Sequence, residues 1–105
     1  MPVLAARIHG FFQARPALAS RVPNGAMYEF KKLYYDVANA TNPSSLAALM
    51  NLVPTSQIIW GSDFPYRAVA PTANGWDSYQ VSPEIKRAVN RENAEKLFPR
   101  FGNPA

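Results

Sequence analysis

Asp63 is the side chain of this sequence whose chemical type and setting best suit catalysis. It follows an apolar run at residues 58–60 and a Gly-Ser pair at 61–62, and a Phe-Pro pair comes directly after it. Parallel α/β folds carry catalytic and metal-binding groups at the carboxyl ends of buried strands. A carboxylate there binds a hard cation or accepts a proton from bound water. The pattern predicts a metal ligand or proton acceptor, and the structural alternative is an acid that caps the following turn.

The other reactive side chains have more ordinary interpretations. Asp36 lies in a β-prone run, where an acid more often anchors a neighbouring loop by hydrogen bonds. Ser62 lacks the Gly-x-Ser-x-Gly setting of a nucleophile, which favours a turn residue. The single histidine, His9, lies beside the apolar stripe of a helical pattern and is more often structural than a ligand there. A guanidinium group and aromatic rings suit contacts with an aromatic acid substrate, and the segment after Asp63 supplies Arg67, Trp76 and Tyr79. The alternative is that this segment packs on itself.

Two β-prone runs, at residues 33–38 and 57–61, are predicted to form parallel strands that position Asp63. The helix expected between them covers residues 43–53. Asn42 supplies its N-cap, Pro43 suits the first helical position, and leucines recur on one face. Strand, helix and strand then form one right-handed βαβ unit. The predicted fold class is therefore α/β.

Further helices are expected near residues 2–14 and 83–98, from apolar residues at helical spacing and from the Ser-Pro-Glu start of the second helix. Turn-forming residues at 17–26 predict a loop. The segment from 62 to 81 is rich in proline, glycine and asparagine and lacks periodicity. Because it follows Asp63 directly, it is predicted to be a long functional loop.

The length of 105 residues suits one small domain and falls far short of the roughly 250 residues of a closed (β/α)8 barrel. Two strands leave a sheet edge open on each side, and open edges pair with further strands. We therefore interpret residues 1–105 as a single partial domain. The rest of its sheet is expected in another copy, in another polypeptide or in an N-terminal region.

Charge and composition argue against several classes of partner. The net charge of +4 comes from basic residues in runs no longer than two, so nucleic acid is not expected as a partner. No apolar stretch approaches the ~20 residues that span a bilayer, and no basic leader precedes an apolar core, so a membrane is not expected either. The sequence contains no cysteine, which excludes disulfides and thiolate metal sites. A cytoplasmic location is the default expectation.

The order of the segments resembles the C-terminal third of amidohydrolase-related barrels, the group that includes aminocarboxymuconate-semialdehyde decarboxylase and resorcylate decarboxylases. The most specific matches are the Gly-Ser-Asp-Phe-Pro block at 61–65 and the Glu-Asn-Ala-x-x-Leu-Phe block at 92–98. The resemblance extends over nearly the whole chain, through the segments 2–8, 33–38, 42–46, 58–65 and 90–98.

This resemblance implies a C-terminal fragment of a (β/α)8 TIM barrel, with the two strands as the seventh and eighth. Asp63 then matches the acid that ends the eighth strand and ligates or lies beside a divalent metal, usually zinc. The other ligands of the family are histidines on the first and fifth strands, with a catalytic histidine on the sixth. No residue of this sequence corresponds to them, and His9 lies where the family has no chemistry.

The function implied is that of the C-terminal portion of a metal-dependent enzyme. Such enzymes perform hydrolysis or non-oxidative decarboxylation of a small carboxylated substrate. The chain is expected to be inactive alone and to pair with further copies or with a complementing N-terminal barrel segment. A different hypothesis is a non-catalytic oligomerisation or interaction module, in which the apolar face of the helix at 2–14 packs on a second copy. A third is a truncated remnant.

Overall fold

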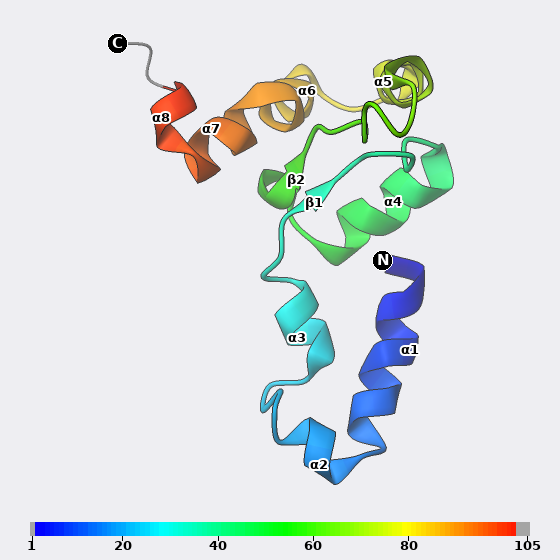
Figure 1. Ribbon diagram of the computed structural model, residues 1–105, viewed down its shortest axis with the longest axis vertical. Coiled ribbons are helices and arrows are strands. Elements are labelled where there is room, and N and C mark those ends of the chain that lie inside the picture. Colours follow the sequence, from blue (N-terminus) through cyan, green and yellow to red (C-terminus); the bar gives the residue numbers. More distant parts are fainter. Residues whose placement is uncertain (1, 103–105) are drawn as a thin grey trace.

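The computed structural model describes the backbone of residues 2–102 and the side chains of residues 4–102. Its centre is a parallel pair of strands, β1 (Tyr35–Asp36) and β2 (Ile58–Ile59), joined through helix α4 (Pro43–Leu52) and a short 3-10 helix, η1 (Thr55–Gln57). Tyr35 pairs with Ile58, and Asp36 with Ile59. The predicted βαβ unit is therefore present (Figure 1).

Both strands are shorter than predicted, because neighbouring side chains and helices take up the backbone groups on either side of the paired residues. The side-chain amide of Gln57 donates to Lys31 O and Leu33 O, 2.6 and 2.7 Å away. The Asn93 amide donates to Ile58 O at 2.8 Å, and Trp60 N–H donates to Val89 O at 3.0 Å. The Ile58 carbonyl and the Trp60 amide therefore already have partners, so neither is free to extend β2.

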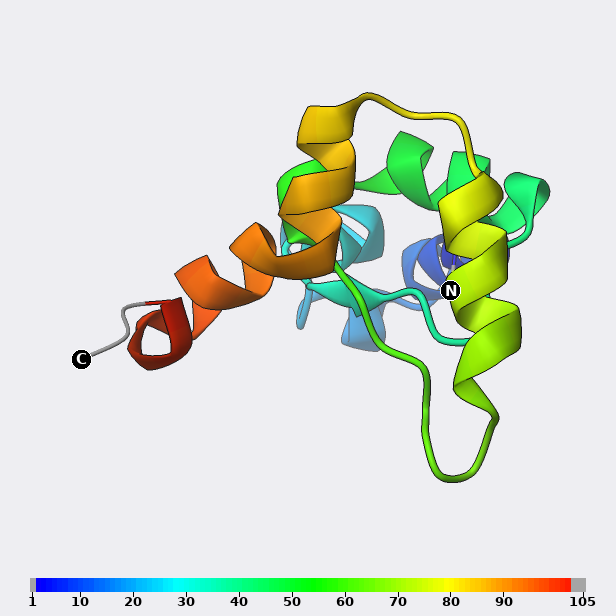
Figure 2. The ribbon, with the colours of Figure 1, turned by 90° about the horizontal axis from the view of Figure 1, so that it is seen from above.

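One face of the strand pair is covered by helices. The covering elements are α4, α5 (Val69–Ser78), α6 (Pro83–Arg87), the π-helical segment η2 (Ala88–Glu92) and α7 (Asn93–Leu97), with α8 (Pro99–Gly102) beyond them. In Figure 2 the helices α4 and α6 lie on one side of the strands, and the segment between β2 and α5 extends on the other side. The buried core between strands and helices consists of Val37, Leu46, Leu49, Val53, Ile58, Trp76 and Val89.

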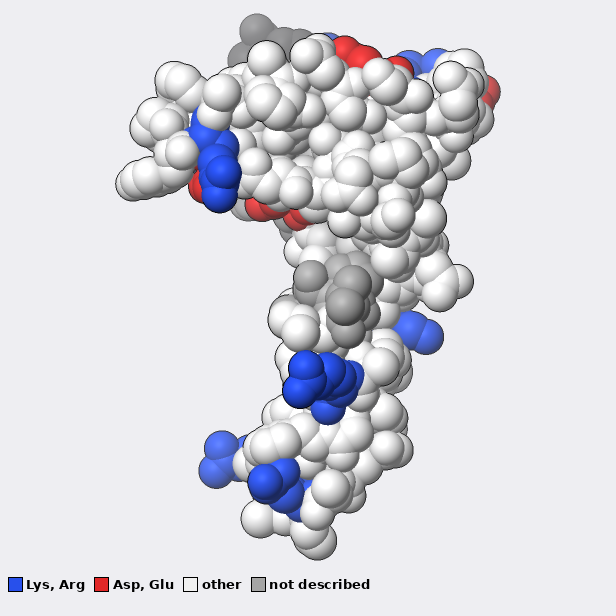
Figure 3. Space-filling model, turned by 90° about the vertical axis from the view of Figure 1, so that its right-hand side faces the viewer, with Lys and Arg blue, Asp and Glu red and all other residues white. Residues whose placement is uncertain are grey.

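Three N-terminal helices form an arm that extends away from the strands, as Figure 1 shows. They are α1 (Pro2–Gln13), α2 (Pro16–Ala19) and α3 (Ala26–Phe30). Ala5 and Ala26 are buried where α1 packs on α3, and His9 Nδ1 accepts a hydrogen bond from Met27 N–H at 3.3 Å. On the face in Figure 3, the basic side chains of the arm form separate clusters divided by uncharged surface. No helix within residues 2–102 is long and apolar enough to cross a bilayer.

Most predicted helices are confirmed, but two segments predicted as loops contain helices. The expected loop at 17–26 includes most of α2, and the expected loop at 62–81 contains α5. Helix α2 is a single turn of four residues without a side-chain cap. Helix α5 holds proline, asparagine and glycine and also has no side-chain N-cap, so its local propensity is poor. Burial of Thr72 and Trp76 holds it in place instead. The predicted helix at 83–98 is present as α6, η2 and α7, and Ser82 caps its start.

Trp76 joins the C-terminal end of α5 to the helix that follows. Its indole N–H donates to Asn90 Oδ1 at 2.7 Å, and its side chain is fully buried. The Lys86 ammonium donates to Trp76 O and lies 4.2 Å from the centre of the Trp76 ring. Burial lowers the pKa of Lys86, and the charge of Asp77 opposes that shift. Tyr79 stacks on Trp76, with ring centres 6.4 Å apart.

We expect Lys86→Met to destabilise the chain by about 1–2 kcal/mol, because methionine keeps the apolar stem but loses the hydrogen bond and the cation–π contact. Urea unfolding followed by tryptophan fluorescence measures this difference. Lys96→Met is the matched control, since Lys96 is exposed and its replacement should change stability by less than about 0.5 kcal/mol. Equal losses of stability in the two variants would show that the Lys86 contacts with Trp76 do not stabilise the chain.

Candidate functional site

The candidate site lies at the carboxyl ends of β1 and β2, in the segment that leads from β2 to α5. Asp63 lies just beyond β2 in the left-handed region, with φ of 64°, a conformation that aspartate and asparagine adopt more readily than most residues. Arg67 N–H donates to the backbone carbonyl of Asp63 at 3.1 Å and closes a turn. The Asp63 carboxylate is exposed and accepts no hydrogen bond from residues 4–102. The turn is therefore closed by the backbone, and the carboxylate is left for another partner.

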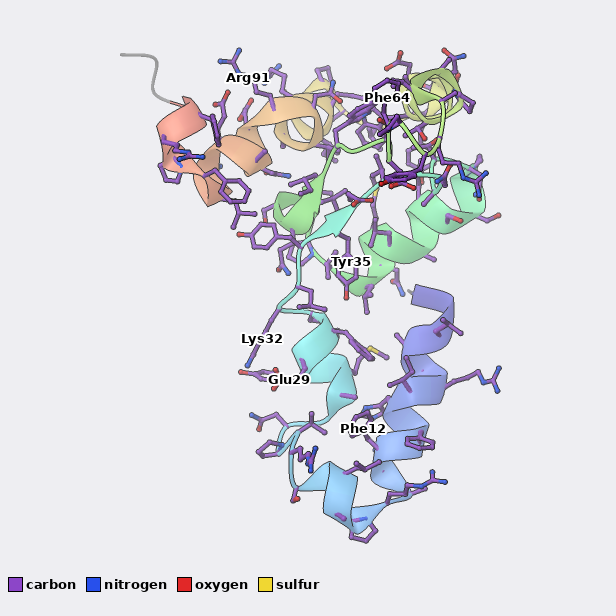
Figure 4. All side chains as sticks on the ribbon, viewed as in Figure 1. Phe12, Glu29, Lys32, Tyr35, Phe64 and Arg91 are labelled. Carbon is purple, nitrogen blue, oxygen red and sulfur yellow. The ribbon has the colours of Figure 1, made fainter. Side chains whose placement is uncertain are left out.

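Two aromatic side chains beside Asp63 are also exposed. Phe64 is 71% and Tyr66 86% accessible, and Figure 4 shows Phe64 beside α5, far from the arm that carries Phe12. Rings this exposed are unusual for a turn, since burial of an aromatic side chain is strongly favourable. Neither ring was predicted as a site residue, because a Phe-Pro pair after a strand indicates by itself only a turn.

Asp36 lies on the same face of the strands as Gly61. Its Oδ1 accepts a hydrogen bond from Ala38 N–H at 3.0 Å, which confirms the predicted anchoring role. A Cβ atom added to Gly61 would lie 3.2 Å from Asp36 Cβ. Because Gly61 has no side chain, the Asp36 side chain fits beside the backbone that leads from β2 to Asp63.

The structure does not gather the remaining sequence candidates around Asp63. His9 lies in the arm and binds the backbone of α3. Ser62 is largely buried at the end of β2. Trp76 is buried in the core and the half-buried Tyr79 stacks on it, which favours the alternative that this segment packs on itself. Arg67 is exposed in the turn after Asp63.

The donor set does not by itself fit a metal ion. Within the described residues, no group of three or more histidine, cysteine, aspartate or glutamate side chains could hold one. A catalytic zinc ion needs three protein ligands. Asp63 supplies one carboxylate, and any metal centre that uses it must take its other ligands from outside this set of residues.

The sequence of the chain is similar to those of known proteins. The sequence model of the amidohydrolase family matches residues 4–100. The decarboxylase yanB of Aspergillus niger is 32% identical over 114 residues, which cover 100% of this chain and 30% of the relative. The 6-methylsalicylic acid decarboxylase of Penicillium expansum is 34% identical over 74 residues, which cover 68% of this chain and 23% of the relative.

A solved structure shares the fold. The crystal structure of the 5-carboxyvanillate decarboxylase LigW from Sphingomonas paucimobilis matches with a TM-score of 0.72 and 15% identity, over 94% of this chain and 30% of that chain. The chain thus spans less than a third of the length of these relatives, and its strands and helices correspond to part of a (β/α)8 barrel. The match to the family over residues 4–100, together with this fold, shows that the chain belongs to the amidohydrolase family.

Proposed function

We propose that this chain contributes the metal-binding carboxylate Asp63 to the active site of a metal-dependent decarboxylase. The observation that carries the proposal is the exposed Asp63 carboxylate, which has no hydrogen-bond partner among residues 4–102 and lies just beyond β2, inside the Gly-Ser-Asp-Phe-Pro block. Active sites of α/β barrels lie at the carboxyl ends of the strands. All three relatives described above are named as decarboxylases, which favours loss of carbon dioxide over hydrolysis.

The substrate class proposed is a small aromatic carboxylic acid. The relatives from Penicillium expansum and Sphingomonas paucimobilis are named for 6-methylsalicylic acid and 5-carboxyvanillate. A divalent metal, zinc by preference, would act as a Lewis acid toward oxygen atoms of the substrate. Asp63 would hold that metal with one carboxylate, and Arg67 carries a cation in the same turn, suited to a substrate carboxylate.

The rest of the site would come from a complementing barrel segment. One carboxylate falls short of a catalytic metal site, so we expect the 105-residue chain alone to have no activity. The uncovered face of β1 and β2, with Tyr34 and Asp36 exposed on it, is where the complementing strands would enclose the barrel interior. A second copy of the chain brings no histidine of the kind the site needs, which makes it the weaker partner for catalysis.

The proposal is tested in a chimera in which residues 1–105 replace the matching region of the Aspergillus niger relative. The chimera and the chain alone are assayed for carbon dioxide release from 6-methylsalicylic acid and related hydroxybenzoic acids, and for metal content by mass spectrometry. We expect turnover and bound metal in the chimera and neither in the chain alone. A folded, metal-loaded chimera that hydrolyses amides or lactones but releases no carbon dioxide would refute the decarboxylase assignment.

A non-catalytic interaction module is the second candidate, and exposed apolar side chains of α1 favour it. Leu4 is 51% and Phe11 48% accessible, although α1 also packs on α3 and α4. If this surface binds a second copy, light scattering should show a dimer whose mass does not change when zinc is added or chelated. A monomer at all accessible concentrations would eliminate this candidate.

A further inference from the structure

We infer that Thr72 and Gly75 are positioning residues that hold the segment carrying Asp63 in place, by docking α5 on the turn that follows β1. The inference adds to the proposed function and rests on it only for the role of Asp63. Neither residue touches the Asp63 carboxylate. Both act through the point at which α5 is attached to the rest of the molecule.

The segment with Asp63 is fixed firmly on its N-terminal side and has little support of its own. Trp60 N–H donates to Val89 O at 3.0 Å, which ties the end of β2 to η2. Residues 63–71 are then exposed without interruption. The backbone bond from Arg67 N–H to Asp63 O closes the turn but does not fix its direction. The direction in which the Asp63 turn leaves β2 therefore depends on the position of the first residues of α5.

The N-terminal half of α5 is attached to the turn after β1 by one hydrogen bond. Asn39 N–H donates to Thr72 Oγ1 at 3.3 Å, and Thr72 is only 2% exposed. Asn39 has φ of 55°, a left-handed conformation that asparagine tolerates well. The Thr72 hydroxyl of α5 thus accepts a hydrogen bond from a backbone amide in the turn after β1.

Close packing against Thr41 completes the attachment. A Cβ atom added to Gly75 would lie 2.4 Å from Thr41 Oγ1 and 2.8 Å from Thr41 O, distances at which atoms cannot coexist. Thr41 is itself buried. Only glycine at position 75 lets α5 approach the turn this closely, so any side chain there would push the helix outward and move the start of α5 with it.

A second set of contacts holds the C-terminal end of α5. Trp76, Asn90 and Lys86 hold its C-terminal end against α6 and η2. Weakening that contact should lower the stability of the whole chain. Weakening the contact at Thr72 should act first on the turn at Asp63, because this turn leads directly into the N-terminal end of α5.

Thr72→Val is the informative substitution, since it keeps the shape of the side chain and removes the acceptor, whereas Thr72→Ser retains the hydroxyl. Amide hydrogen exchange of the chain is followed by NMR at Arg67, which reports on the turn, and at Trp60, which reports on β2. Loss of one hydrogen bond corresponds to about a tenfold change in exchange rate. We expect Arg67 to exchange about tenfold faster in Thr72→Val, Trp60 to be unchanged, and Thr72→Ser to resemble the parent. Gly75→Ala should give the larger change at Arg67.

Two controls separate this inference from the proposed function. Lys86→Met should accelerate exchange at both amides in proportion to its loss of stability, and Asp63→Asn should change neither. If Thr72→Val accelerates Arg67 and Trp60 equally, Thr72 has only a general structural role and the inference fails. In the chimera, Thr72→Val should weaken zinc binding by about tenfold or more, in the range typical of groups that orient metal ligands. Faster exchange at Arg67 without weaker zinc binding would instead count against Asp63 as a ligand.

Discussion

Asp63→Asn should abolish carbon dioxide release by the chimera, with kcat/KM lowered by at least about 10³-fold, the scale on which loss of an essential catalytic group acts. The amide has almost the same shape as the carboxylate but carries no charge, and it binds a divalent cation far more weakly. Metal content measured on the same preparation should fall together with activity. The expected loss is the largest of any single substitution proposed for this chain, because no other acid lies just beyond β2.

Asp63→Asn should not change the stability of the chain. Asp63 is exposed, and its left-handed backbone conformation suits asparagine as well as aspartate, so its urea midpoint should match that of the parent. Asp77→Asn removes the same charge from an exposed position on α5 and should leave both metal content and turnover intact. Turnover retained in Asp63→Asn would remove Asp63 from the site, whatever the behaviour of the control.

Asn93→Leu should give the largest loss of stability, about 3 kcal/mol in the free energy of unfolding. Asn93 is 2% exposed, and its amide donates to Thr55 O at 2.6 Å and to Ile58 O at 2.8 Å. Leucine has a similar volume but no donor, so the buried carbonyl of Ile58 loses the Asn93 amide and Thr55 O keeps only the Ile58 N–H. An unsatisfied buried polar group costs about 1–3 kcal/mol, and small domains have only about 5–15 kcal/mol to lose.

Thermal and urea unfolding, followed by circular dichroism, measure this loss. Asn51→Leu makes the same chemical change at an exposed position of α4 and should shift stability by less than about 0.5 kcal/mol. If Asn93→Leu costs no more than this control, water replaces the amide at little cost and the helix at 93–97 does not hold β2. The result bears on the site, because β2 leads directly to Asp63.

The asparagine belongs to the second sequence block that suggested the family. The Gly-Ser-Asp-Phe-Pro block supplies the candidate ligand, and the block at 92–98 supplies the side chain that holds the strand before it. The π-helical segment η2 lies between the two, and its Val89 carbonyl accepts from Trp60 N–H. Insertions of this kind are frequent near functional sites. The two blocks are thus parts of one structural unit that carries Asp63.

The sequence by itself determined the elements whose signals are local. Asn42 and Pro43 start α4, Ser82 and Pro83 start α6, and the apolar runs mark β1 and β2, because capping and side-chain patterning act within a few residues. It also placed Asp63 just beyond a strand and identified the family, since both rest on residue order alone. The length and the two strands indicated a partial sheet, and the family resemblance implied that this sheet is part of a barrel.

Only the tertiary structure decided the rest, because the forces involved act between residues distant in sequence. Helix α5 forms against its own poor propensity, since Trp76 is buried in the core and Thr72 and Gly75 meet the turn after β1. The same packing buries Trp76 and stacks Tyr79 on it, whereas Asp63 and Phe64 stay exposed. No local pattern encodes these contacts, because each depends on which surfaces the folded chain brings together.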